Sequence, residues 1–233
     1  MNERRWERLG AQAGIAFVVL GVIGIVLQGE VPSQNATGAA LIEYMADQRD
    51  GLMWSCAVWS IASLCGLFFI ATVRARISEA EGGHNELATA VVIGGLMTFV
   101  ANLVSSIMVT AMAFRDPGAI DEATVRLAFD VMNFGFIAAN VGVALVAGSA
   151  AAVVLSTGLL PRWVGWFSVA VMGLCIVSLL GVVATDGFLA PGGGFQYVVG
   201  AAGLAMFLAL AIEFLMHAEA PAKAATPAAA MPA

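Results

Sequence analysis

The sequence predicts an all-α fold, a polytopic membrane helix bundle of six transmembrane helices with a short external amphipathic helix. Hydrophobic residues make up 61% of the 233 positions and charged residues only 11%, whereas soluble domains average about 45–50% and about 25%. The mean hydropathy is +0.92. Six apolar runs long enough to cross about 30 Å of hydrocarbon are separated by polar segments within residues 1–217. The chain is therefore expected to be an integral membrane protein.

The first span is expected over residues 9–27, behind a short basic head that carries Arg4, Arg5 and Arg8. The apolar run exceeds the roughly 7–15 residues of a signal-peptide core, and no cleavage site of small residues follows it directly. A retained span is therefore favoured over a cleaved signal.

A polar segment over residues 30–50 leaves the membrane and is expected to contain the external amphipathic helix. Thr37 is a suitable N-cap. Apolar and acidic residues then fall on opposite faces of a helix: Leu41, Tyr44 and Met45 on one, Glu43 and Asp47 on the other. Such a helix lies on the membrane surface or caps the bundle. An ordinary ordered loop is the alternative.

The second and third spans are expected over residues 52–73 and 87–114, joined by a cytoplasmic loop that follows Arg74 and Arg76. The third span carries polar residues broadly on one side: Thr98, Asn102, Ser105, Ser106 and Thr110. Asp116-Pro117 then matches an N-cap followed by the first position of a new helix.

The fourth span, residues 127–155, carries the most informative polar residues of the chain. Asp130, Asn133 and Asn140 recur at spacings of three and seven, which places them on one face of a helix. The two asparagines are expected to form hydrogen bonds with Asn102 and with Ser105 or Ser106 of the third span.

The last two spans are expected over residues 163–184 and 197–216. Gly158 and Pro161 mark a tight turn before the fifth span. Residues 185–196, with three consecutive glycines, are expected to form a flexible external loop. The Ala- and Pro-rich residues 218–233 lack periodicity, which predicts a disordered cytoplasmic tail.

The distribution of basic residues predicts that both termini are cytoplasmic. With the N-terminus inside, seven of the ten Lys and Arg residues fall in inner segments and three in outer ones, the latter being Arg49, Arg115 and Arg126. Acidic residues favour the outer segments, among them Glu30, Glu43, Asp47, Asp50, Asp116, Asp121, Glu122 and Asp186. This bias indicates either a vestibule that attracts cations or a solvated surface.

The turn between the fourth and fifth spans carries a family resemblance. Its sequence, Ser156-Thr157-Gly158-Leu159-Leu160-Pro161-Arg162-Trp163-Val164-Gly165, resembles the corresponding stretch of a bacterial six-span family, domain-of-unknown-function family 4386. The basic head, the external segment and the six spans resemble that family loosely. The resemblance implies a six-span architecture in the cytoplasmic membrane of a bacterium. It implies no activity, cofactor or site residue.

Several classes of protein receive no support from the sequence. Ten Lys and Arg residues in no dense cluster argue against nucleic-acid binding. The three cysteines are interpreted as small hydrophobic residues, and the two histidines lie outside the spans or at their edge, so no cofactor and no metal site are expected. Motifs of metalloproteases, serine hydrolases and P-loop ATPases are absent. Enzymatic activity is therefore not favoured.

Two functions remain from different classes. The first is a structural or accessory membrane protein, whose polar residues join helices within the bilayer and which pairs with a further copy or a membrane-protein partner. The second is a small-solute, ion or proton carrier that uses a polar site between spans three and four, comprising Asp130, Asn133, Asn140, Asn102, Ser105 and Ser106. The absence of an evident repeat between the two halves of the chain favours the first. The carrier hypothesis predicts a cavity that reaches Asn140, and the structural one predicts direct contacts without a cavity.

Overall fold

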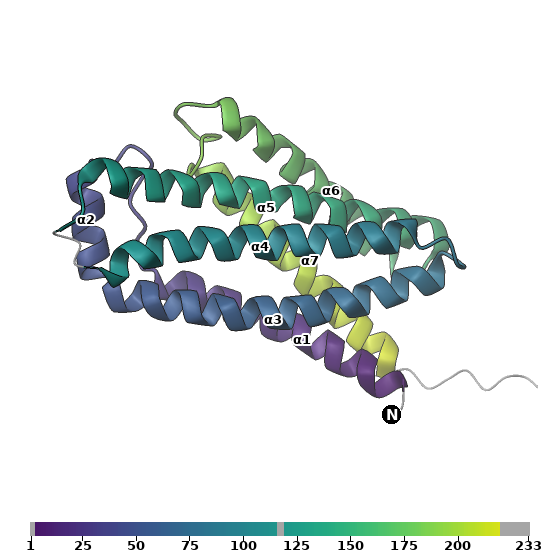
Figure 1. The fold of residues 1–233 in the computed structure, drawn as a ribbon. Coiled ribbons are helices and arrows are strands. Elements are labelled where there is room, and N and C mark those ends of the chain that lie inside the picture. Colours follow the sequence, from purple (N-terminus) through teal and green to yellow (C-terminus); the bar gives the residue numbers. More distant parts are fainter. Residues whose placement is uncertain (1–2, 116–118, 220–233) are drawn as a thin grey trace, which may run out of the picture.

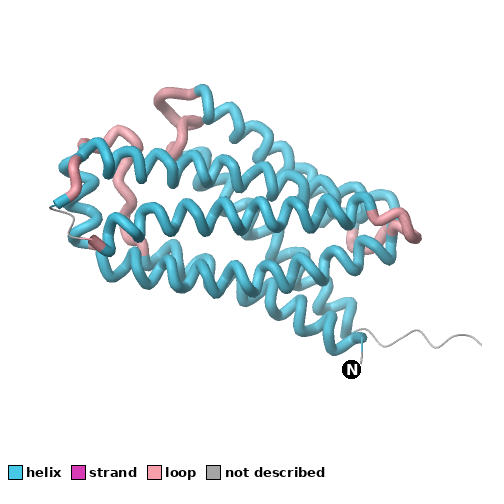
Figure 2. The backbone as a smooth tube through the Cα atoms, viewed as in Figure 1, coloured by secondary structure: helices cyan, strands magenta, loops and turns pink. Residues whose placement is uncertain are grey.

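The computed structural model describes residues 3–115 and 119–219, and all regular secondary structure in these ranges is helical. Figure 1 shows the long helices α1, α3, α4, α5, α6 and α7 side by side with the short helix α2 across one end, and Figure 2 shows the loops that join them. The elements are α1 (Glu3–Leu27), α2 (Gly38–Asp47), α3 (Arg49–Ala80), α4 (Glu86–Phe114), α5 (Glu122–Thr157), α6 (Arg162–Ser178), the 3₁₀ helix η2 (Leu179–Val183) and α7 (Gly194–Glu219). Within the described ranges, six segments are long and apolar enough to cross a membrane, the fifth formed by α6 and η2 together. The all-α, multi-pass membrane fold is confirmed.

The six long helices form a ring in chain order. Helix α1 packs against α3, α3 against α4, α4 against α5, α5 against α6, and α6 against α7, which returns to α1. The start of α1 and the end of α7 lie at one end of the bundle, here called the terminal end (Figure 1). The other end carries α2 and is called the α2 end. The first and last spans are therefore neighbours.

Helix α2 caps the bundle, which is one of the two placements predicted for the external amphipathic helix. Thr37 accepts a hydrogen bond from the Ala40 amide at 3.2 Å, which confirms it as the N-cap. The apolar face of α2 packs on α3, α4 and α5 in a cluster of buried residues: Leu41, Tyr44, Met45, Leu52, Val109, Ala113, Val125, Phe129 and Met132. Burial, assisted by the nearby Tyr197, raises the pKa of Tyr44 to about 12. Its hydroxyl therefore stays protonated and donates to the Gln28 carbonyl at 2.8 Å.

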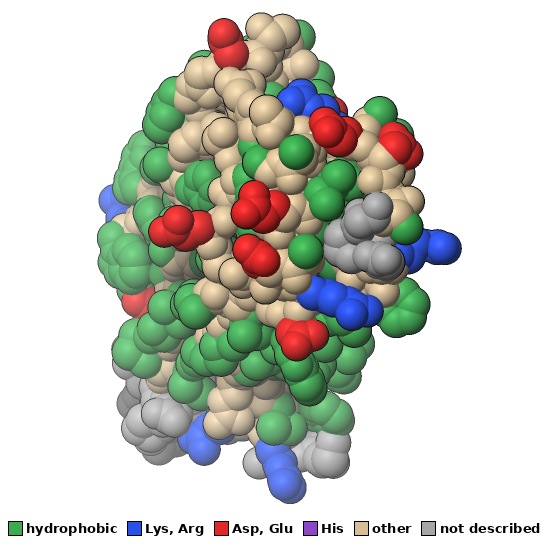
Figure 3. Space-filling view, turned by 90° about the vertical axis from the view of Figure 1, so that its left-hand side faces the viewer, with side chains coloured by type: hydrophobic (Ala, Val, Ile, Leu, Met, Phe, Trp, Pro, Cys, Tyr) green, Lys and Arg blue, Asp and Glu red, His purple; other side chains and the backbone are tan. Residues whose placement is uncertain are grey.

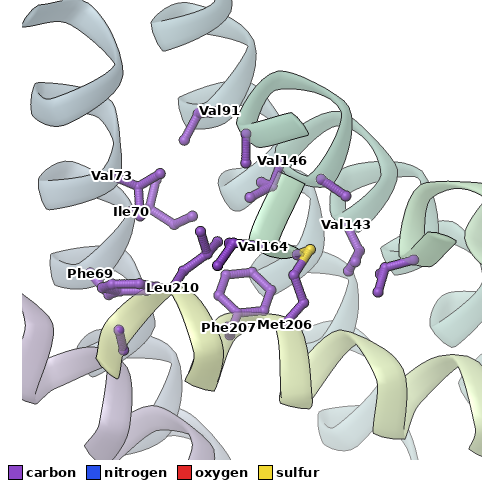
Figure 4. Close-up of a cluster of buried hydrophobic side chains, with 14 of the residues drawn as sticks. Phe69, Ile70, Val73, Val91, Val143, Val146, Val164, Met206, Phe207 and Leu210 are labelled. Atoms are coloured by element: carbon purple, nitrogen blue, oxygen red, sulfur yellow. The ribbon is translucent and has the colours of Figure 1, made fainter. Parts of the chain in front are cut away.

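Aromatic side chains hold the ring together near its centre. Phe17 of α1 meets Phe99 of α4 and Phe207 of α7 edge to face, with ring centroids 5.2 and 5.4 Å apart. Figure 4 shows Phe207 beside Met206 and Leu210 of α7, among side chains from the neighbouring helices. Such edge-to-face pairs each contribute about 0.5–1.5 kcal/mol beyond burial. The first and last spans are thus joined by a close-packed aromatic contact.

The fifth span departs from the uninterrupted helix that the sequence predicts. It is α-helical to Ser178 and continues to Val183 as the 3₁₀ helix η2. Gly181 lies so close to the 184–193 loop that a Cβ atom there would sit 2.5 Å from the Leu189 carbonyl oxygen. The change of helix type therefore coincides with close packing of this loop.

Other helix ends extend beyond the apolar runs by a few residues, because polar residues continue a helix past the hydrocarbon. Helix α7 begins at Gly194 and so includes Gln196, which was expected in a loop. It also includes residues 218 and 219, the first two of the expected tail. The rest of that tail and Asp116-Pro117 lie outside the described residues.

The α2 end is rich in acidic side chains. Figure 3 views this end and shows Asp and Glu residues spread over it, with fewer Arg residues among them. The acidic residues of the α2-end loops and helix starts are exposed: Glu30, Glu43, Asp47, Asp50, Asp121, Glu122 and Asp186. Arg49 donates to the Ala113 and Phe114 carbonyl oxygens at the end of α4, both at 3.1 Å. At least one basic residue of this end is therefore used to hold helices together.

Candidate functional site

The polar faces of the third and fourth spans meet in direct contact, here called the α4–α5 seam. Gly94 and Gly142 bring the two backbones together, since a Cβ atom on Gly94 would lie 2.6 Å from the Gly142 carbonyl oxygen. Thr98 donates to the Gly94 carbonyl at 2.9 Å and contacts the Ala139 carbonyl of α5 at 3.3 Å. Buried Ser105 packs against Gly135 and donates to a carbonyl oxygen of its own helix. The two helices are thus in direct contact at these residues, and Thr98 also lines the cavity beside them.

A cavity of about 590 Å³ lies beside this seam, between α1, α4, α5 and α7. It is called the amide cavity because five carboxamide side chains line it: Gln28, Asn102, Asn133, Asn140 and Gln196. The rest of the wall is mainly aliphatic, aromatic and glycine residues, with none of its described residues charged. Phe17 and Phe207 lie at the level where α1 and α7 are in contact. From there the lining residues continue toward Gln28 and Gly192 at the α2 end.

Asn140 joins three helices at the wall of the amide cavity. Its side-chain amide donates to the Ser178 hydroxyl at 3.0 Å and to the Gln196 side-chain oxygen at 3.2 Å. Gln196 in turn reaches the Ser178 carbonyl at 3.5 Å. Ser178 is the residue at which α6 changes to η2. This arrangement, here called the Asn140 node, therefore joins α5, α6 and α7 where the fifth span changes helix type.

The expected pairing of Asn140 with the third span is not the one observed. Its partners come from the fifth and sixth spans instead. Asn102 donates to the Thr98 carbonyl of its own helix at 2.8 Å. Asn133 lies against the 184–193 loop, since a Cβ atom on Gly192 would be 3.0 Å from both of its amide atoms. The three asparagines share the cavity wall without bonding to one another.

The other three predicted site residues lie elsewhere. Asp130 is exposed and does not line the amide cavity. Helix geometry explains this, because a spacing of three residues turns the side chain by about 60° from Asn133, whereas a spacing of seven leaves Asn140 within about 20° of it. Ser105 is part of the α4–α5 seam, and Ser106 lines a separate cavity of about 10 Å³ near α2. The structure thus brings Asn102, Asn133 and Asn140 together at one cavity.

Three residues of this site were missed by sequence reasoning: Gln28, Ser178 and Gln196. Gln28 follows the first apolar run and Gln196 precedes the last one. At such positions, next to a polar loop, a polar residue is usually solvated. Gln28 donates to Ser55 of α3 at 3.0 Å. Ser178 lies alone in an apolar run and is fully buried. The carboxamides in and next to the spans are the sequence signal that could have found these residues, because a buried amide needs hydrogen-bond partners on other helices.

Metal binding receives no support from the described residues, in which no three His, Cys, Asp or Glu side chains lie close enough to hold an ion. The amide cavity therefore offers neutral hydrogen-bonding groups and apolar surface. This arrangement can hold an uncharged molecule by shape and orient it by a few polar contacts.

Comparisons with known proteins found no relative of this chain. No protein-family model matches the sequence, and neither the curated proteins nor the solved structures contain a significant match.

Proposed function

We propose that this protein is a membrane-embedded binding protein or carrier for a small, uncharged and mainly apolar molecule, which it holds in the amide cavity. The observation that carries the proposal is the cavity itself. Its volume of about 590 Å³ falls within the roughly 300–1,000 Å³ of small-molecule sites, which are typically apolar with a few placed polar groups. The carboxamides supply those groups.

Exposure along the cavity wall supports entry from the bilayer. Val22 and Ile25 of α1 and Tyr197 of α7 line the cavity and yet are 48%, 49% and 60% exposed. Closer to the terminal end, α1 and α7 are in contact, with Gly14 against Ala211 and Gly21 against Leu204. The cavity is therefore open beside the parts of α1 and α7 that carry exposed apolar side chains, where lipid chains would surround a spanning helix.

The charge of the wall favours a neutral ligand over an ion or proton. An uncompensated charge in an apolar membrane site costs several kcal/mol. The described wall holds neither a carboxylate for a cation nor a basic group for an anion. Asp130, the one carboxylate of the carrier site predicted from the sequence, is not among the wall residues. A purely structural role is favoured only for the α4–α5 seam.

We also infer that both termini face the cytoplasm and that the protein belongs to the bacterial cytoplasmic membrane. The excess of basic residues near the terminal end supports the orientation. The family 4386 resemblance supports the location, and its turn has a defined physical role here. Gly158 adopts the left-handed conformation with φ of 71° at the end of α5, and Pro161 precedes α6. Reporter fusions to each terminus test the orientation.

The cavity is tested with a pair of glycine variants. A Cβ atom on Gly200, which lines the amide cavity, or on Gly173 of α6, outside its wall, would meet no heavy atom within 4 Å. Gly200→Phe therefore fills cavity space, and Gly173→Phe is the matched control. Thermal unfolding of the purified protein is measured against a panel of neutral amphiphiles, since a ligand present at 100 times its Kd adds about 2.7 kcal/mol of stability.

The proposal expects at least one compound that stabilises the native chain and the Gly173→Phe variant but has a much weaker effect on Gly200→Phe. Equal stabilisation of both variants contradicts binding in the amide cavity. A panel in which no neutral compound stabilises the native chain contradicts the proposed function as a whole.

A further inference from the structure

The hydrogen bonds of the Asn140 node fix which way its amide points. Ser178 has one hydroxyl proton, and it donates that proton to the Cys175 carbonyl at 2.6 Å. Toward Asn140 the hydroxyl can therefore only accept. The NH₂ group of Asn140 must face Ser178, and its second proton goes to the Gln196 side-chain oxygen. The carbonyl oxygen of Asn140 is left without a partner among the described residues.

Gln28 is fixed by the same logic. The Ser55 hydroxyl donates to the Gly24 carbonyl at 2.8 Å and so accepts from the Gln28 side-chain NH₂ at 3.0 Å. The partner of the Asn102 NH₂ group is the Thr98 backbone carbonyl, which can only accept. In each of these two amides one NH₂ proton is committed to the protein, and the second has no partner among the described residues. The carbonyl oxygen, which has two lone pairs, is unpaired as well.

These three oxygens are not sealed inside the protein. Within the described chain, Ser168 Oγ is the one fully enclosed side-chain polar atom without a partner. The unpaired oxygens of Gln28, Asn102 and Asn140 are therefore accessible, and all three residues line the amide cavity. Asn133 and Tyr197 supply groups that can donate or accept. The three fixed amides present two lone pairs on each oxygen, against one remaining proton each on Gln28 and Asn102, so they offer the cavity more acceptor than donor positions.

We propose that the ligand of the amide cavity is a neutral lipid alcohol, an apolar molecule with at least one hydroxyl group, taken up from the bilayer. This inference rests on the proposed function and specifies its ligand class. A hydroxyl donates its proton to an unpaired amide oxygen. An ether or ester of the same shape offers no proton, so the acceptor oxygens of the wall stay unpaired when it binds.

Discrimination of this kind is measurable because unpaired buried groups are costly. One net hydrogen bond contributes about 0.5–1.5 kcal/mol, which corresponds to a roughly two- to thirteenfold difference in affinity. The preference should therefore appear as a ratio of two dissociation constants, for a hydroxyl compound and for its methyl ether, with the apolar part held constant.

The test uses farnesol and farnesyl methyl ether as probes, with the full-length protein in lipid nanodiscs. Each Kd is obtained from the thermal stabilisation as a function of probe concentration. The native chain is compared with Gln28→Leu, Asn102→Leu and Asn140→Leu. Asn102→Leu is the mildest, since its amide bonds only within its own helix. Gln12→Leu is the control, because this exposed carboxamide of α1 lies outside the cavity wall.

The expected result is a roughly two- to thirteenfold preference for farnesol in the native chain and in Gln12→Leu. This preference is lost in at least one of the three wall variants, while ether binding is retained. Equal binding of alcohol and ether overturns the ligand class but leaves the proposed function standing. A preference for farnesol that persists in all three wall variants likewise overturns the proposed recognition of the ligand and leaves the proposed function standing. If neither probe binds, the ligand class is overturned, and the separate panel with Gly200→Phe decides the proposed function.

Discussion

The α4–α5 seam and the amide cavity are adjacent regions built from similar residues, and they differ in how far the helices approach. In the seam, glycines bring two backbones into contact, and the hydroxyls of Thr98 and Ser105 donate to carbonyl oxygens beside them. In the amide cavity, α1 and α7 stand away from α4 and α5, and carboxamide oxygens remain unpaired. In the seam the hydroxyls are enclosed between two helices, whereas at the cavity the amide NH₂ groups bond to the protein and the amide oxygens face open space.

This difference shows that an intramembrane polar residue cannot be assigned a role from its chemistry alone. A hydroxyl can return its single proton to the preceding turn of its own helix. A carboxamide has two protons and an acceptor oxygen, which one neighbouring turn cannot satisfy. Amides in a membrane helix therefore need partners from other helices or from a ligand.

The largest expected effect comes from adding one methyl group to each region. In Gly142→Ala the new Cβ atom overlaps the Gly94 carbonyl oxygen and Thr98, and backbone cannot move aside without separating α4 from α5. We expect a loss of about 1–3 kcal/mol or more in the free energy of unfolding. Gly200→Ala meets no atom within 4 Å and should be neutral or stabilising by up to about 1 kcal/mol. Detergent-induced unfolding measures both, and equal effects would remove the distinction between seam and cavity.

A smaller difference in the free energy of unfolding is expected between variants of two asparagines of the cavity wall. Asn140→Leu removes two interhelical hydrogen bonds, each worth about 0.6 kcal/mol on average in membrane proteins, so we expect a loss of about 1 kcal/mol. Asn133, which makes no side-chain hydrogen bond among the described residues, should tolerate Leu with no measurable loss. The same unfolding assay applies. A larger loss for Asn133→Leu would mean that this side chain has a structural partner.

The smallest effect concerns the start of α5, the helix that belongs to both regions. The Thr124 hydroxyl and amide donate to the exposed Asp121 carboxylate, at 2.6 and 3.0 Å, and lower its pKa. The ionised form is favoured in the folded state, so its contribution is complete above the unfolded pKa of about 3.9 and disappears as pH falls through the lower folded value. Asp121→Asn should lower the unfolding temperature slightly at pH 7. If the variant's lower unfolding temperature persisted unchanged well below pH 4, the effect would come from something other than the Asp121 charge.

Much of the fold follows directly from the sequence. Six apolar runs predict the six long helices, and the opposite faces of the segment around Tyr44 predict helix α2. Thr37 and Gly158 mark helix ends by chemistry that acts within a few residues. These features are local, so they can be seen without knowing which helices are neighbours.

The site depends on contacts between distant parts of the chain. A helical pattern shows that Asn140 and Asn133 share a face, but not that Asn140 bonds to α6 and α7 and that Asn133 lies against the 184–193 loop. Gln196 was assigned to a loop because three glycines precede it, although the helix already begins at Gly194. The cavity lies where α1 and α7 stand away from α4 and α5, and no local pattern encodes this arrangement of distant helices.

The contact between Phe17 and Phe207 also has a consequence for biosynthesis. These residues are 190 positions apart (207 minus 17), and synthesis at about 5–20 residues per second separates their appearance by roughly 10–40 s. During this interval the second to fifth spans can pair in sequence, but the ring remains open between α6 and α1. The amide cavity acquires its last wall only when α7 inserts. Ligand binding therefore becomes available in the final step of assembly.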